Sequence, residues 1–239
     1  SEEAVVEQAT ENNKLAAKAT ARMLESELIG LVGQLRGAAN NPELAEAIRR
    51  EGSLPIQERP YLGQLLRSFR RHYGQPRRLD SRRRAPHPDD ADPPSEHELV
   101  DRSWFVTDAN GVQLWREPFG DTIDGHYHWR EYFHWGNEDR PKSTPFSEIE
   151  KHWEGQSFHI STPFVSEETN RYMIAISVLV HERDNPEPIG VLARTIELGK
   201  LLSNKNLGGT RTVAMVDGRD GQFLDHPKLA SPQYQDPDS

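Results

Sequence analysis

The spacing of apolar residues changes near Ser103, and this change constrains the fold more than any other feature of the sequence. Before it, apolar residues recur three and four positions apart, which is the period of an amphipathic helix. After it, apolar and polar residues alternate in short runs, which is typical of β-strands with one buried face. The sequence therefore predicts an α+β protein with a helical first part and a β-rich second part.

Three helices are predicted in the first part. The longest covers about residues 2–39, a stretch without proline whose small and apolar positions form one stripe: Ala17, Ala21, Leu24, Leu28, Leu31, Leu35 and Ala38. Its first half is polar, so we expect that half to need a partner chain or a nearby membrane. A second helix begins at Asn41, with Pro42 in the first helical position, and ends near Gly52. A third carries the stripe Leu62, Leu65, Leu66, Phe69 and Tyr73.

A charged, proline-rich segment separates the two parts. Residues 76–98 have no apolar period and predict a long surface loop. Eight arginines lie around its start: Arg67, Arg70, Arg71, Arg77, Arg78, Arg82, Arg83 and Arg84. Such a cluster would suit nucleic acid, anionic lipid or cell-wall polymer. However, five acidic residues follow within residues 89–98 and the formal charge of the chain is −9, so we favour a self-neutralising loop and expect no nucleic-acid partner.

Five strands are predicted in the second part, at residues 103–107, 112–115, 158–164, 172–180 and 189–196. The first two flank the turn Asp108-Ala109-Asn110-Gly111, which indicates a hairpin. A further hairpin is predicted between residues 212 and 224, around Asp217-Gly218-Arg219-Asp220-Gly221. The pattern as a whole predicts an antiparallel sheet of about five strands.

The composition excludes several classes of protein. With no cysteine, the chain has no disulfide, no thiolate nucleophile and no thiolate metal site. No apolar run is long enough for a membrane helix, and no positively charged stretch followed by an apolar region, the pattern of a signal peptide, opens the given sequence. The nucleophile elbow, the phosphate-binding glycine loop and the helical zinc motif are also missing, so we expect no catalytic activity from this segment. Because the sequence does not begin with Met, we expect a piece of a longer, membrane-anchored protein.

Several motifs resemble those of Cache sensor domains. The stretch Trp104-Phe105-Val106-Thr107-Asp108-Ala109-Asn110-Gly111 is similar to the family's hairpin, and Trp129-Arg130-Glu131-Tyr132-Phe133 to its aromatic helix. Three strand motifs follow in the family's order: Ile160-Ser161-Thr162-Pro163-Phe164, Ile174-Ala175-Ile176-Ser177 and Ile189-Gly190-Val191-Leu192. Over about residues 1–224 the chain resembles the membrane-distal half of a double Cache ectodomain.

The resemblance implies a long N-terminal helix and a helical layer packed on a PAS-like antiparallel sheet. It divides the chain into four parts: a long helix and helical layer at 1–75, the charged loop at 76–98, a PAS-like Cache sheet domain at 99–202, and the start of a second, truncated or small membrane-proximal Cache-like unit at 203–239. No cofactor is expected with this organisation.

The resemblance also implies the extracytoplasmic, periplasmic ligand-sensing domain of a bacterial transmembrane receptor. The long helix would carry the signal and would be a surface for a homodimer. The attached output module is a kinase in this hypothesis, serine/threonine in preference to histidine. Two alternatives stay open: a structural or dimerisation ectodomain with no small-molecule ligand, and a cytoplasmic PAS-like module that holds a haem or flavin.

Arg130 is the candidate anchor for a ligand. It lies in the most aromatic window of the chain, next to His128, Trp129, Tyr132 and Phe133. A guanidinium between aromatic rings can bind a carboxylate or phosphate with two hydrogen bonds while the rings exclude water. The competing interpretation is that the arginine caps a helix or pairs with a carboxylate and that the rings are ordinary core.

Amino-acid-binding members of the family hold the ligand's ammonium group with two aspartates. Laid onto this sequence, their positions fall on Ser166 and Thr195, and neither side chain is charged. Glu167 and Glu168 are adjacent but are expected to be solvated. The departure favours a small carboxylate, another anion or a ligand with no cationic group.

Strand alternation supplies the remaining candidates. If Tyr172, Ile174, Ile176 and Val178 face the helices, then Met173, Ala175 and Ser177 face the opposite side, where a Cache pocket would lie. The candidate ligand-binding set is Arg130, Trp129, Tyr132, Phe133, His128, Ser161, Phe164, Ser166, Ser177 and Thr195. Arg194 is expected at the surface or in an ion pair.

A metal site is a weaker hypothesis. His126, His128 and His134 cluster in sequence, and Asp124 or Glu131 would complete a divalent-ion site. Solvated or hydrogen-bonded histidines are the default interpretation, so no metal is predicted.

Overall fold

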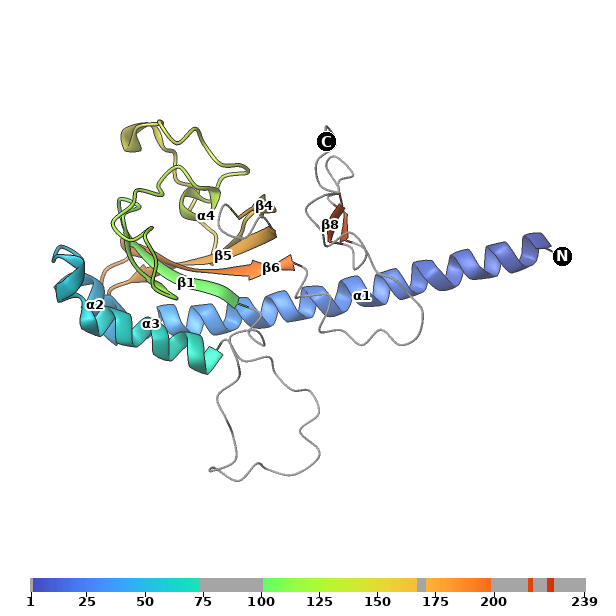
Figure 1. Cartoon of the computed structure of the whole chain (residues 1–239), viewed down its shortest axis with the longest axis horizontal. Coiled ribbons are helices and arrows are strands. Elements are labelled where there is room, and N and C mark those ends of the chain that lie inside the picture. The colour runs from blue at the N-terminus through green and yellow to red at the C-terminus, as the bar shows by residue number, and fades with distance from the viewer. Residues whose placement is uncertain (1, 74–100, 167–170, 199–214, 217–222, 226–239) are drawn as a thin grey trace, which may run out of the picture.

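The computed structural model describes residues 2–73, 101–166, 171–198, 215–216 and 223–225 (Figure 1). Helices come first in the chain and an antiparallel sheet follows. This order confirms the predicted α+β class and the packing of a helical layer on a sheet. The predicted loop at residues 76–98, residues 199–202 and the C-terminal tail lie outside the described residues.

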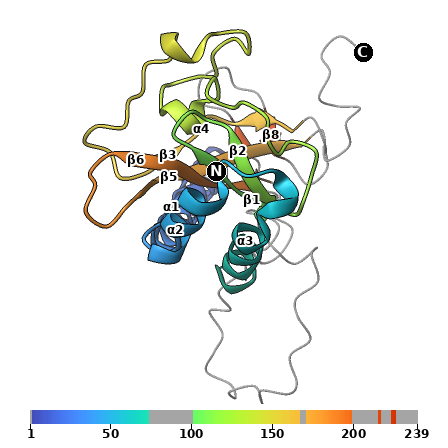
Figure 2. The same cartoon turned by 90° about the vertical axis from the view of Figure 1, so that its left-hand side faces the viewer.

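The helical layer covers one face of the sheet (Figure 2). It consists of α1 (Glu2–Ala39), α2 (Pro42–Glu51), the 3-10 helix η1 (Ile56–Glu58) and α3 (Pro60–Tyr73). Helix α2 begins where the sequence predicts. The Asn41 side chain caps it by accepting a hydrogen bond of 2.9 Å from the Glu43 amide, and Pro42 has no amide hydrogen that would need an acceptor.

The main sheet has six strands: β1 (Asp101–Asp108), β2 (Gln113–Glu117), β3 (His159–Ile160), β4 (Phe164–Val165), β5 (Tyr172–His181) and β6 (Pro188–Glu197). Their order is β2-β1-β6-β5-β3, and β4 also pairs with β5. The turn between β1 and β2 is held by Asp108, whose carboxylate accepts from the amides of Asn110 and Val112. Gly111 adopts a φ of 80° there, and an added Cβ would lie 2.7 Å from the His128 backbone.

The prediction of one continuous strand at residues 158–164 is wrong. The segment forms two short strands, β3 and β4, with an interruption at Ser161, Thr162 and Pro163. The Thr162 amide points to the Glu131 carboxylate, 3.0 Å away, instead of joining the sheet. Pro163 has no amide hydrogen to give to a ladder, so the pairing resumes only at Phe164.

The residues of β5 divide between the two faces of the sheet as their alternation predicts. Ile174, Ile176, Val178 and Val180 pack in the same core as the helices, whereas Ala175 packs in a second core on the opposite face. The second strand begins and ends slightly later than predicted, at Gln113–Glu117.

The expectation that Arg194 lies at the surface is wrong. Its side chain is fully buried on the helical face of β6, next to Leu192 and Ile196 in the alternation. The guanidinium donates to Gln34 of α1 at 3.0 Å and lies 4.9 Å from the centre of the Trp104 ring. The helical layer covers this position, so the guanidinium lies inside the fold, with Gln34 and Trp104 among its partners.

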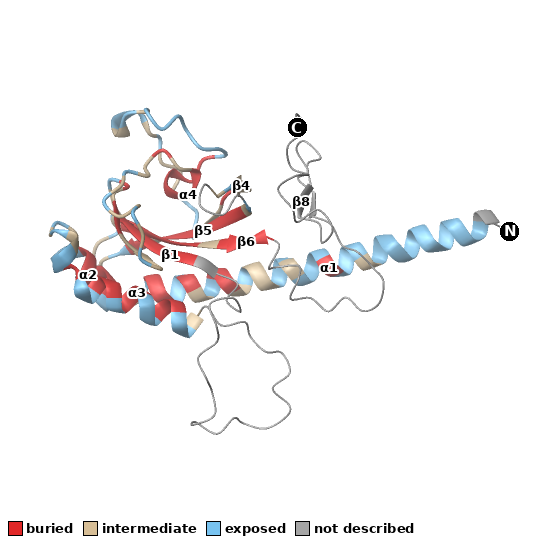
Figure 3. Cartoon of the chain, in the orientation of Figure 1, coloured by how far each residue is buried: buried red, intermediate tan, exposed pale blue. Residues whose placement is uncertain are grey.

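Only the C-terminal part of α1 lies against the sheet (Figure 3). The buried residues there are Leu31, Val32, Leu35, Ala38 and Ala39, with Leu24 and Leu28 partly buried. The stripe predicted to begin at Ala17 is wrong at its start, because Ala17 and Ala21 are exposed. No helix among the described residues combines the length and apolar character needed to cross a membrane.

Beyond the main sheet, two short strands are described, β7 (Met215–Val216) and β8 (Phe223–Asp225). They pair with each other in antiparallel fashion, as the predicted hairpin at residues 212–224 requires. The division into a second Cache-like unit from residue 203 stays a prediction.

Leu35→Ala should destabilise the protein by about 2–5 kcal/mol, because the side chain is 0% exposed and its loss leaves a cavity between helix and sheet. The matched control is Leu15→Ala in the same helix, where the side chain is 62% exposed and little change is expected. Urea or thermal unfolding measures both variants. Equal effects of the two substitutions would contradict the position of α1 on the sheet.

Candidate functional site

The face of the sheet opposite the helices carries the candidate site. Its core consists of Phe105, Tyr132, Phe133, Ala175, Val191 and Ala193. The short helix α4 (Glu131–His134) and the loop of residues 137–157 lie on this side (Figure 2). The predicted aromatic window therefore packs on the strand face that alternation assigned to a pocket.

Helix α4 is a single turn that is fixed at both ends. At its start, the Asp139 carboxylate accepts from the Glu131 amide at 2.8 Å and from Arg130 Nη1 at 2.6 Å. At its end, Trp135 adopts a left-handed conformation with φ 60°, and its amide donates to the Glu131 carbonyl at 2.7 Å. A turn this short is marginal alone, so these contacts set the position of Arg130.

Glu131 is a buried acid that ties α4 to the interrupted strand. Its carboxylate accepts from Thr162 Oγ1 at 2.6 Å, from the Thr162 amide at 3.0 Å and from His159 Nε2 at 3.0 Å. Burial alone raises the pKa of Glu131, but the hydrogen bonds from His159 and Thr162 together outweigh burial and hold the pKa below its ordinary value. Glu131 is therefore ionised and fully hydrogen-bonded, and it acts as a structural clamp.

Arg130 lies between two aromatic rings, as predicted for an anion anchor. The guanidinium carbon is 4.2 Å from the Trp129 ring centre and 5.5 Å from that of Phe164, and the side chain is 19% exposed. One terminal nitrogen, Nη1, is bonded to Asp139. The structure thus brings Arg130, Trp129 and Phe164 together, with a carboxylate of the same chain bound to the arginine.

Two other predicted aromatic residues are core residues. Tyr132 and Phe133 are buried, and Tyr132 packs edge-on against Phe105 with ring centres 5.0 Å apart. Burial raises the pKa of the Tyr132 hydroxyl well above its usual range. His128, another residue of the predicted set, connects two parts of the chain. Its Nε2 lies 2.9 Å from the Thr144 carbonyl, and this contact joins the following loop to the aromatic segment.

The predicted hydroxyl residues make internal hydrogen bonds. Ser161 Oγ donates to the Thr162 carbonyl and accepts from the Ala175 amide, each at 2.9 Å. Ser177 Oγ accepts from Trp135 Nε1 at 2.9 Å, and Thr195 Oγ1 lies 2.8 Å from Ser103 Oγ. These side chains lie on or beside the predicted face, and their bonds join its parts together. Ser166, half-buried after β4, donates its amide to the Arg171 carbonyl.

Lys151 is a charged residue that sequence reasoning missed. Its ammonium group lies over the rings of Trp153, Phe146 and Phe133, at 4.5, 4.7 and 5.7 Å from the ring centres. It also donates to the Ala109 carbonyl at 3.1 Å. The signal in the sequence was a lysine two positions before a tryptophan, in a loop that follows an aromatic helix.

Asp139 and Glu197 were missed as well. Asp139 stands in a polar loop with no period, so nothing in the sequence links it to Arg130. Glu197 is buried at the end of β6, two positions beyond Thr195, and is ion-paired with Arg171. Glu197 therefore supplies a carboxylate near Thr195, which stands where the family has an aspartate. The guanidinium of Arg171 neutralises this carboxylate.

The histidines do not form a metal site in the part of the chain that the structure describes, where no group of three or more His, Asp or Glu could hold an ion. The rings of His126 and His128 are 6.1 Å apart. The proposed carboxylate partners are otherwise bonded, Asp124 to Arg59 at 2.6 Å and Glu131 to His159.

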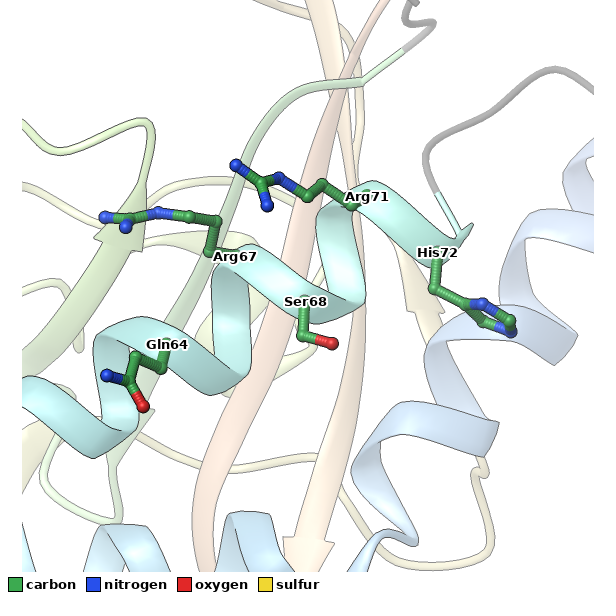
Figure 4. A pocket seen from close by; sticks show the side chains of 5 residues that line it. All are labelled: Gln64, Arg67, Ser68, Arg71 and His72. Carbon is green, nitrogen blue, oxygen red and sulfur yellow. The ribbon is translucent and has the colours of Figure 1, made fainter. Parts of the chain in front are cut away.

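A pocket of about 670 Å³ lies elsewhere, on the outer side of α3 (Figure 4). The described residues that line it are Gln64, Arg67, Ser68, Arg71 and His72. All five belong to the helical layer, and none is in the predicted ligand-binding set.

No protein-family model matches the sequence, and no curated protein is significantly similar to it. Solved structures do share the fold. The ligand-binding domain of the Pseudomonas fluorescens chemoreceptor CtaA, in complex with L-serine, is 16% identical with a TM-score of 0.50, over 89% of this chain and 70% of that chain. An extracellular ligand-binding receptor from Desulfohalobium retbaense is 11% identical with a TM-score of 0.56, over 90% and 31%. The sensor domain of the V. cholerae histidine kinase DctB is 10% identical with a TM-score of 0.56, over 86% and 62%.

These neighbours are sensor or ligand-binding domains of receptors, not catalytic domains. Identities this low show the fold alone. The fold implied by the Cache resemblance, a long helix and helical layer on a PAS-like sheet, is thereby confirmed.

Glu131→Gln should lower stability at pH 7 by about 1–3 kcal/mol, because it weakens a fully bonded buried carboxylate. The folded-state pKa of Glu131 lies below its ordinary value of 4.5, so its contribution is complete above that pH and is lost as the pH falls through the folded-state pKa. The free energy of unfolding, measured from pH 7 to pH 3, should differ less and less between wild type and variant as the pH falls. The exposed Glu154→Gln is the control, and a gap that stays constant down to pH 3 would contradict the clamp.

Proposed function

We propose that this chain is the extracytoplasmic ligand-sensing domain of a bacterial transmembrane receptor. It binds a small molecule, a carboxylate or other anion, on the sheet face that carries Arg130. The full-length protein is anchored in the membrane, and its output module is a kinase, serine/threonine in preference to histidine. The solved structures of the same fold support a sensing role, since CtaA is a chemoreceptor whose domain is in complex with L-serine and DctB is a histidine kinase.

The position of Arg130 carries the proposal. Its guanidinium lies between Trp129 and Phe164 and already holds one carboxylate, that of Asp139, at 2.6 Å. A guanidinium offers several donors in a planar fork and binds carboxylates with directional hydrogen bonds. A ligand carboxylate would replace Asp139 and gain the shielding of the same two rings. Trp129, Phe164 and Arg130 are the residues of the predicted set that we place in direct contact with it.

The long helix α1 would transmit the event. Its C-terminal part packs on β5 and β6, and its first half presents exposed apolar side chains: Val5, Val6 and Leu15. A homodimer through this half would bury these residues. A shift of the sheet would then move one rigid helix against its partner, which is a recognised way to pass a signal.

A structural or dimerisation ectodomain without a ligand is the second candidate. The ion pair between Arg130 and Asp139 favours it, since the anchor is satisfied within the chain. The internal bonds of Ser161, Ser177 and Thr195 point the same way. The two candidates differ in whether a free anion displaces Asp139.

The test is a thermal-stability screen of wild type against small carboxylates and inorganic anions, repeated with two substitutions. Arg130→Ala should abolish the stabilisation that a ligand produces. Asp139→Asn should strengthen binding, about 10-fold, because it removes a competitor for the guanidinium. A ligand at 100 times its Kd adds about 2.7 kcal/mol to the folded state, which is a rise of several degrees.

Arg140→Ala is the matched control, because Arg140 lies nearby, has the same charge and is half-exposed. It should leave the ligand's effect unchanged. If no anion stabilises either the wild type or Asp139→Asn, the structural ectodomain is favoured.

A further inference from the structure

We propose that Phe133, Phe146 and Trp153 form a cation-binding subsite that takes the ammonium group of an organic cation, and that Lys151 occupies it as a tethered substitute. The role of this subsite in sensing rests on the proposed function, whereas the binding itself does not. The subsite differs from the Arg130 position in its residues and in the charge it selects.

The contacts of Lys151 define the subsite. Three ring centres lie within 5.7 Å of the ammonium nitrogen, and one carbonyl oxygen, that of Ala109, accepts a hydrogen bond at 3.1 Å. Aromatic faces at this range attract cations, and several of them around one cation form the cage by which proteins bind ammonium groups. Three rings and one carbonyl suit a primary ammonium and also a methylated one.

The rings are held in place without the lysine. Trp153 Nε1 donates to the Phe133 carbonyl at 2.7 Å, and the two rings meet edge to face at 5.5 Å. Phe133 is fully buried in α4. Phe146 starts the 3-10 helix η3 (Phe146–Glu148) and packs edge-on against His128, with ring centres 5.7 Å apart. Removal of the Lys151 side chain would therefore leave a preformed cage.

Two nearby carboxylates favour a positive charge at this position, but burial opposes it more strongly. Asp108 and Glu187 act on Lys151 as negative charges, although burial is the larger influence and lowers the pKa of the ammonium group. Entry into the cage removes water from the lysine ammonium, and this desolvation is the main reason that its pKa is lowered. An organic cation that sheds water more easily than a primary ammonium can compete for the same rings.

The experiment uses chemical rescue. Lys151→Ala opens the cage and should lower the unfolding temperature, and tetramethylammonium chloride should raise it again by several degrees relative to equal sodium chloride. Lys151→Met keeps the cage filled with an uncharged side chain of similar length, so it should bind tetramethylammonium at least about 10-fold more weakly than Lys151→Ala does. The neutral tert-butanol, of similar shape, should not rescue Lys151→Ala.

A measurement on wild type keeps the proposal testable if Lys151→Ala does not fold. Tetramethylammonium should displace the Lys151 amine and increase its rate of acetylation by acetic anhydride, read by mass spectrometry, while the exposed Lys18 reacts at an unchanged rate. Equal rescue by tert-butanol, or an acetylation rate of Lys151 that tetramethylammonium does not alter, would overturn the subsite. The tetramethylammonium experiments do not depend on the anion screen. Their failure would leave the Arg130 proposal intact, and failure of the anion screen would leave the cation subsite intact.

Discussion

The buried carboxylate of Glu131 is the contact on which the candidate face depends. An ionised acid inside a protein is stable only when donors surround it, and leaving it unpaired would cost several kcal/mol. Thr162 and His159 supply those donors from the segment between β3 and β4. The Thr162 amide leaves the sheet to do so, which is why the strand is interrupted and why α4 lies on β5. Arg130 precedes Glu131 directly, so the same clamp determines where this proposed anion anchor lies.

Local patterns predicted much of this fold. The cap at Asn41, the turn at Asp108 and the alternation along β5 depend on residues close in sequence, and the structure has all three. Contacts between distant residues were not predictable in this way. Arg194 bonds to Gln34 across 160 positions and Thr162 to Glu131 across 31, and no period in the sequence records either pair. For the site, the aromatic setting of Arg130 was visible in sequence, but its partner Asp139 was not, because a loop residue carries no pattern.

One loop, residues 137–157, supplies both Asp139 to the arginine and Lys151 to the aromatic cage. Each is a tethered group, and a tethered group competes at an effective concentration in the millimolar range for a short flexible link. In the proposed anion site and the proposed cation subsite, a free ligand would therefore have to displace an intramolecular contact before it binds. This competition would lower the apparent affinity and set a threshold concentration. Binding would also release a loop contact, so it would change the loop as well as the site.

Strand β6 has one face on the candidate site and the other on α1. Alternate residues of that strand face opposite ways: Ala193 and Thr195 belong to the candidate face, while Arg194 is bonded to Gln34 of α1. A strand cannot move on one face alone, because its backbone is shared and paired on both edges. Helix α1 has 38 residues, which is about 57 Å at 1.5 Å per residue. Since only its C-terminal part packs on the sheet, a small tilt where Gln34 meets Arg194 becomes a larger displacement at the far end.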